Sequence, residues 1–225
     1  MMQLKPYETS KSPVIGHVDM QVNVGDMIGV SKSTCCIKIR RVTRAIARLS
    51  CQHICFPATA QQCSDVMRGF YAIASFLGVL GAVDCTHIPL QSPGGESAEL
   101  LRNRKGYFSL NVQAVVAADL RVTNVVARWH GSAHDATIFS NSHLCARFEA
   151  KEFGRGYLLG DAGYPCRPYL LTPVASPQTE AQQRYNFAHI QTRNVVERAF
   201  GVVKRRFPCL RLGLRGKVFA LIIIK

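Results

Sequence analysis

Acidic residues are scarce in this chain of 225 residues: 14 Asp and Glu stand against 28 Lys and Arg, which gives a formal net charge of +14. A surplus of this size makes a polyanion, and nucleic acid above all, the favoured class of partner. A basic protein without a specific partner is the alternative. An anionic membrane surface is disfavoured, because no basic amphipathic stretch has the large aromatic face that such binding favours.

Long apolar segments are also absent. No run approaches the roughly 18 residues that span a membrane, and the apolar stretch 218–224 is short, so it predicts a core strand or helix. Residues 1–13 contain no apolar segment of the kind found in a secretory signal peptide. These absences predict a protein without a membrane partner.

The nine cysteines include no Cys-x-x-Cys pair and form no even framework. An odd count without a secretory signal indicates reduced thiols in a nuclear or cytoplasmic protein. Cys51 and Cys55 flank His53 in a spacing that suggests zinc, but no second pair matches them. A structural zinc site is therefore disfavoured.

The segment 25–50 has the pattern of a helix-turn-helix. Gly29 suggests a tight turn and Ser31 an N-cap, and apolar residues then recur at helical spacing from Cys35 to Leu49. Cations lie between them, as on a helix that contacts DNA phosphates; an ordinary basic surface helix is the alternative. We place this segment in an N-terminal helical region, residues 1–75. Its DNA-binding candidates are Lys32, Lys38, Arg41 and Arg44.

Residues 76–225 predict an α/β domain with a mixed sheet. The apolar run 76–83 predicts a buried strand that ends on Asp84. A hairpin follows, then a helix capped by Ser132, two short strands, a polar loop and a helix capped by Thr192. The ranges are 108–118 and 122–129 for the hairpin, 132–148 for the first helix, 156–161 and 169–174 for the short strands, and 176–184 for the loop.

Three acids in this pattern predict a metal site. Asp84 and Asp161 end the first and fourth strands, which can be neighbours, and Glu197 is the sole acid from residue 182 onward. Converging carboxylates need a cation, and oxygen ligands suit Mg²⁺ or Mn²⁺, which can activate water against a phosphodiester. The alternatives are an Asp84 neutralised by an Arg or backbone N–H groups, a turn Asp at 161, and a helical pair of Glu197 with Arg193. Asp135 is a fourth candidate ligand, or else a first-turn Asp favoured by the helix dipole.

Five motifs in the expected order resemble the PIF/Harbinger family of DDE transposases and the nucleases derived from them. They are residues 83–88 (VDCTHI), 103–107 (NRKGY), 131–135 (GSAHD), 160–165 (GDAGYP) and 196–201 (VERAFG). The resemblance spans about residues 25 to 217, and the spacing of 36 positions from Asp161 to Glu197 is typical of a DDE core.

The resemblance implies an RNase H-like fold and a divalent-metal-dependent DNA endonuclease with Asp84, Asp161 and Glu197 as catalytic triad. Arg104 and Lys105, in the second motif, join the DNA-binding candidates. The resemblance also implies nuclear action and a Myb-like DNA-binding partner protein; a homo-oligomer is compatible with it. The family's closing helix is either missing or replaced by residues 217–225, so we expect a C-terminally truncated nuclease domain. A catalytically inactive DNA-binding protein and a scaffold on the same fold are the alternatives.

Overall fold

A computed structural model of the protein describes residues 28–92 and 94–214. The chain divides into two compact units, residues 1–43 and residues 44–225. The predicted domain boundary at residue 75 stays a prediction. The apolar stretch 218–224 and the first helix of the predicted helix-turn-helix lie outside the described residues. In the part of the chain that is described, no helix is long and apolar enough to cross a membrane.

The described start of the chain has the predicted turn and cap. Gly29 has a positive φ of 66°, a conformation that glycine adopts without strain. The Ser31 hydroxyl accepts a hydrogen bond from the Thr34 N–H at 3.2 Å, and helix α2 (Lys32–Arg48) follows. Cys35 is buried, whereas the later apolar residues of the helical pattern are exposed: Ile39, Val42, Ile46 and Leu49.

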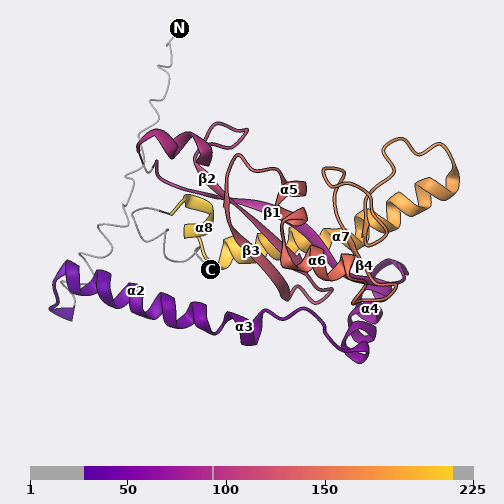
Figure 1. Ribbon diagram of the computed structural model, residues 1–225, viewed down its shortest axis with the longest axis horizontal. Coiled ribbons are helices and arrows are strands. Elements are labelled where there is room, and N and C mark those ends of the chain that lie inside the picture. The colour runs from indigo at the N-terminus through magenta and orange to yellow at the C-terminus, as the bar shows by residue number, and fades with distance from the viewer. Residues whose placement is uncertain (1–27, 93, 215–225) are drawn as a thin grey trace, which may run out of the picture. The chain divides into compact units, whose positions relative to one another are not determined.

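The second unit is built on one five-stranded mixed sheet, consistent with an RNase H-like fold (Figure 1). Its order is β3-β2-β1-β4-β5, in which β1 pairs antiparallel with β2 and parallel with β4. The predicted neighbourhood of the first and fourth strands is therefore confirmed. The strands are β1 (Val79–Pro89), β2 (Ser109–Val116), β3 (Val122–His130), β4 (Tyr157–Leu159) and β5 (Leu170–Leu171).

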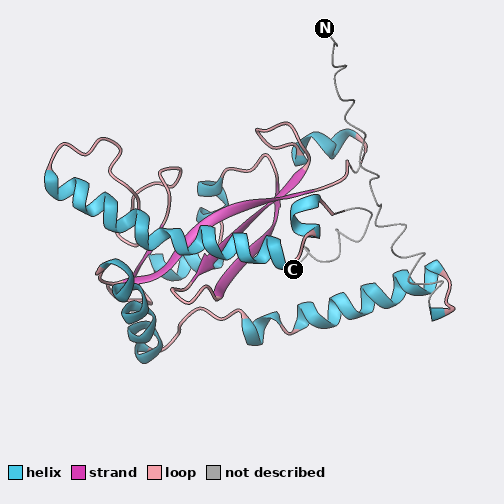
Figure 2. Cartoon of the chain, turned by 180° about the vertical axis from the view of Figure 1, so that it is seen from behind, coloured by secondary structure: helices cyan, strands magenta, loops and turns pink. Residues whose placement is uncertain are grey.

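Helices cover both faces of this sheet. Figure 2 shows α7 in front of the strands, and Figure 1, from the opposite side, shows α5 and α6 in front of them. A β-bulge at residues 79–81 of β1 sets the faces, so that Ala82 packs with α4 and α7 and Val83 with α5 and α6. The other elements are α3 (Ser50–His53), α4 (Ala60–Ala74), η1 (Glu96–Leu101), α5 (Asp135–Ser140), α6 (His143–Glu149), α7 (Glu180–Arg206) and α8 (Cys209–Leu212).

Two predicted boundaries in the middle of the chain were wrong. Strand β1 does not end on Asp84, because its ladder with β2 continues until Pro89 pairs with Ser109. The helix predicted from Ser132 is two helices. Its break lies at Ser142, whose hydroxyl accepts from the Cys145 N–H at 3.1 Å and so starts α6.

The helix that carries Glu197 begins earlier than predicted. Helix α7 starts at Glu180, where Thr179 and Gln182 form a capping box, so part of the predicted loop 176–184 is helical. Thr192 is no cap, because it is buried inside the helix and its hydroxyl donates to the Ala188 carbonyl at 2.7 Å. The longer helix crosses the sheet and places Glu197 beside it.

His189 of α7 links stability to pH. It is fully buried against the Phe76 and Tyr185 rings, and its Nε2 contacts the Leu171 carbonyl at 3.0 Å. Burial lowers the pKa of His189, and the nearby Arg193 charge lowers it further, although the Leu171 contact opposes both. The unfolded chain therefore takes up the proton first as pH falls.

We expect the contribution of neutral His189 to the free energy of unfolding to be fully present above about pH 6.5, the usual His pKa. This contribution should decrease as the pH falls below that value. His189→Gln keeps a donor for Leu171 and should flatten this dependence in urea titrations at several pH values. His143→Gln, at an exposed position, is the control and should leave the profile as in wild type. An unchanged profile in His189→Gln would refute this assignment.

Candidate functional site

Asp84 lies on β1 just where the shorter strand β4 stops pairing with it. The last parallel pair joins Ala82 with Leu159. Strand β4 ends at Leu159, so the predicted strand end at Asp161 was wrong; counted on in the same register, Asp161 comes level with Asp84. The neighbouring strands thus bring two of the predicted triad acids together where β4 ends beside the middle of β1, as the topology led us to expect.

The Asp84 carboxylate is mostly buried and has a partner on each oxygen. Its Oδ1 accepts from the Cys85 N–H at 2.7 Å, and its Oδ2 accepts from Arg193 Nη1 at 3.1 Å. Burial raises the pKa of Asp84 to about 6; the Cys85 hydrogen bond and Arg193 oppose the rise, and the carboxylates of Asp161 and Asp135 add to it. Asp84 is therefore the centre of a group of acids.

Glu197 joins this group through the same arginine. Arg193 Nη2 donates to Glu197 Oε1 at 2.6 Å while Nη1 contacts Asp84. The structure thus contains both alternatives, an arginine partner for Asp84 and a helical ion pair for Glu197. The same guanidinium makes both contacts and so bridges β1 and α7.

Asp161 is held by a local hydrogen bond and Asp135 by one from a neighbouring strand. The Gly163 N–H donates to Asp161 Oδ1 at 3.0 Å, which is the turn geometry we weighed as an alternative for this residue. Asp135 begins α5, and its Oδ1 accepts from Asn111 Nδ2 at 2.7 Å. Both carboxylates raise the pKa of Asp84 through their negative charge, so both lie near it.

The chemistry of this group fits a hard divalent cation. All the candidate donors are carboxylate oxygens, and a buried carboxylate that faces two others needs positive charge nearby. Among residues 28–92 and 94–214, however, no three His, Cys, Asp or Glu side chains lie close enough together to ligate one ion. Between Asp84 and Glu197, the positive charge is that of Arg193.

Comparison with known proteins identifies the family. The model of the DDE superfamily endonuclease family matches residues 83–223. The chain belongs to this family. The human protein named "Putative nuclease HARBI1" is 36% identical over 192 residues, which cover 84% of this chain and 54% of that protein. Its Xenopus laevis counterpart is 34% identical over 190 residues, also with 84% and 54% coverage.

A more distant relative extends the comparison to plants. The Arabidopsis thaliana "Protein ALP1-like" is 27% identical over 203 residues, which cover 82% of this chain and 48% of that protein. The chain thus spans about half the length of the curated relatives it matches. No solved structure shows a significant match to it. The predicted resemblance to Harbinger-derived nucleases is confirmed.

Sequence reasoning missed Asn111, which holds Asp135 on one side of this group of acids. It is 1% exposed, and its Nδ2 donates both to Asp135 and to the Ala133 carbonyl at 3.0 Å. An Asn inside a mostly apolar strand was the available signal, because a buried amide needs partners. Burial also raises the pKa values of two neighbours, Cys85 and Tyr164, whose side chains contact each other at 3.5 Å.

The predicted DNA-binding residues fall into two groups. Lys32 begins α2, and Lys38, Arg41 and Arg44 are exposed along it. Arg104 and Lys105 lie in the turn before β2, and their charges lower the pKa of His87, which burial lowers most. Sequence reasoning missed Lys204 of α7. Its charge also lowers the pKa of His87, and its Nζ donates to the His87 carbonyl at 3.2 Å.

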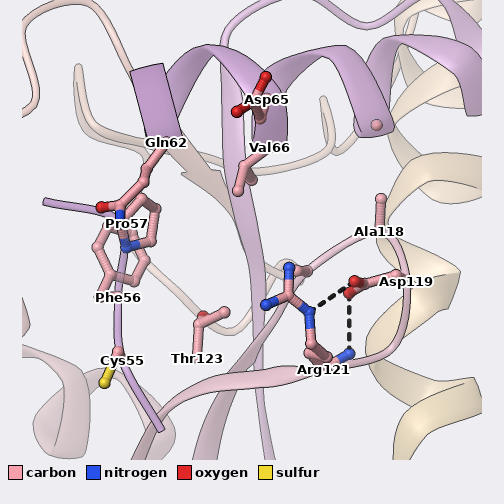
Figure 3. Close-up of a pocket in the computed structure, with 12 residues that line it drawn as sticks. Cys55, Phe56, Pro57, Gln62, Asp65, Val66, Ala118, Asp119, Arg121 and Thr123 are labelled. Carbon is pink, nitrogen blue, oxygen red and sulfur yellow. Dashed lines mark hydrogen bonds and ion pairs between the residues drawn. The ribbon is translucent and has the colours of Figure 1, made fainter. Parts of the chain in front are cut away.

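A groove of about 370 Å³ lies elsewhere in the second unit (Figure 3). Phe56 and Pro57 line one side, and the Asp119–Arg121 ion pair of the β2–β3 turn lies at the other. Its lining includes none of the described candidate residues of the acidic site. The candidate acids therefore lie beside the middle of β1, beyond the end of β4, and not in this groove.

Asn111→Ala should lower the free energy of unfolding by about 1–3 kcal/mol, because it removes the donor of the half-buried Ala133 carbonyl and of Asp135. Urea denaturation measures the change. Asn141→Ala is the matched control: its exposed amide donates to Thr137 at the end of α5, and it should cost less. Equal losses in both variants would contradict the role given to Asn111.

Proposed function

We propose that this chain is a divalent-metal-dependent DNA endonuclease. Asp84, Asp161 and Glu197 would be its triad, with Asp135 as a further acid beside them. The observation that carries the proposal is the grouping of carboxylates around the mostly buried Asp84, in a chain of the DDE endonuclease family. Burying a carboxylate beside other acids is costly unless positive charge compensates it, and a bound divalent cation would supply more of that charge than Arg193 alone.

Each residue has a distinct task in this proposal. The Cys85 N–H fixes one oxygen of Asp84, and Asn111 fixes one oxygen of Asp135. When bound by these acids, a divalent cation supplies Lewis-acid stabilisation of the charge that develops on a phosphodiester. The strand position of Asp84 holds its side chain more rigidly than a loop would, and the Gly163 N–H fixes Asp161 just beyond the end of β4.

Asp84→Asn, Asp161→Asn and Glu197→Gln should each reduce nicking of supercoiled plasmid by roughly two orders of magnitude or more, because each removes a ligand charge from the site. The assay uses the full chain with Mg²⁺ or Mn²⁺, and with EDTA as blank. Asp135→Asn, tested beside Asp161→Asn, shows which acid is the second member of the triad.

Two acids with ordinary ion pairs supply the controls. Glu180 pairs with Arg184 at the exposed start of α7, and Asp65 pairs with Arg68 on α4. Glu180→Gln and Asp65→Asn should keep wild-type nicking. The proposal fails if wild type does not cleave with either metal, or if Asp84→Asn cleaves as well as wild type. DNA binding that persists in EDTA without any cleavage would point to the inactive DNA-binding alternative.

The DNA strand would lie over the cations next to the acids. The charges of Arg104, Lys105 and Lys204 each lower the pKa of His87, two residues on from Cys85, so these cations lie near it. Burial lowers the pKa of Lys204, and the charge of Lys105 lowers it further. Two lysines held near each other are suited to a phosphate, which would relieve their repulsion.

Lys105→Gln and Lys204→Gln should weaken DNA binding and reduce the slope of log affinity against log salt by about 0.9 for each phosphate that the variant no longer neutralises. Fluorescence anisotropy with a DNA duplex at several salt concentrations measures both. Lys151→Gln, at an exposed position between α6 and β4, should keep the wild-type slope. Equal slopes in all three variants would argue against this surface.

The cellular setting belongs to the proposal as well. A DNA endonuclease acts where DNA is, so we propose nuclear action, and the free cysteines are compatible with a reducing nucleus or cytoplasm. A Myb-like protein would supply sequence-specific DNA binding, and homo-oligomers would bring two sites to one DNA. Salt-dependent co-purification and light scattering test these two points.

A further inference from the structure

Arg193 occupies a position that the proposed chemistry does not explain. Its side chain is 14% exposed, and its two terminal nitrogens bind Asp84 of β1 and Glu197 of α7. These are two of the three acids proposed to hold the metal. A cation fixed by the chain thus lies on oxygens that a divalent ion would use.

An ordinary helical ion pair on the same helix provides the comparison. Arg184 pairs with Glu180 at 2.6 Å with the same four-residue spacing, but both side chains are mostly exposed. Such surface pairs contribute little to stability. Arg193 differs because it is buried and reaches a second carboxylate 109 residues away in sequence. Removing Arg193 would leave Asp84 without the cation that compensates its burial.

We propose that Arg193 is a built-in counter-ion, which neutralises the acids in the metal-free protein and competes with the divalent cation for Asp84 and Glu197. It is a positioning residue that acts through these carboxylates. Metal binding then requires the guanidinium to release at least one oxygen, so Arg193 weakens metal affinity while it stabilises the metal-free fold. This inference rests on the proposed metal-dependent function.

Metal-dependent thermal unfolding of the full chain tests the competition without measuring cleavage. In EDTA, Arg193→Gln should melt lower than wild type by about 2–4 °C or more, and Arg184→Gln should melt close to wild type. On titration with Mg²⁺ or Mn²⁺, we define the metal midpoint as the concentration that gives half of the change in melting temperature. The metal midpoint of Arg193→Gln should be at least about fivefold lower than that of wild type. Arg193→Lys keeps the charge but loses the fork of donors. Its metal midpoint should lie between those of wild type and Arg193→Gln.

The inference is overturned if Arg193→Gln has the metal midpoint of Arg184→Gln, or if it needs more metal than wild type. If melting of wild type and all variants ignores metal, the competition is refuted, and so is the proposed metal-dependent function. If all respond to metal at one midpoint and Asp84→Asn abolishes nicking, the proposed function stands and this inference alone fails.

Discussion

The burial of one carboxylate, Asp84, is the constraint on which the site depends. A carboxylate on a strand within a packed sheet is unfavourable unless donors and cations surround it. Here the Cys85 N–H and the Arg193 guanidinium fill that role, yet the pKa of Asp84 is still raised to about 6. The fold therefore retains a carboxylate that is costly to bury, as functional sites commonly do.

The sheet explains why distant acids meet at this point. Because β4 is shorter than β1 and parallel to it, its chain leaves the ladder beside Asp84 and carries Asp161 there. Helix α7 packs on the face of the sheet to which Asp84 belongs, and Arg193 links it to that strand. Strand lengths and helix packing thus gather side chains that are more than a hundred residues apart.

Much of this arrangement could be predicted from local pattern. Apolar runs before Asp84 and Asp161 predicted the two strands, and an α/β sheet of this connectivity allowed β1 and β4 to be neighbours, as they are. Local pattern could not predict how far paired strands extend or which residue caps a helix. Whether β1 ends at Asp84 depends on β2, and whether α7 starts at Thr179 or Thr192 depends on which hydroxyl meets a free N–H. The links made by Asn111 and Arg193 are long-range contacts that no spacing in the sequence displays.

The central claim is that these acids form one divalent-metal site for cleaving DNA. Crystals of the full chain grown with Mn²⁺ test it most directly through anomalous scattering. The account predicts a Mn²⁺ peak between Asp84 and its neighbouring acids, with Arg193 withdrawn from at least one carboxylate. Arg193 still bridging Asp84 and Glu197 at saturating Mn²⁺, with no peak at these acids, would contradict it.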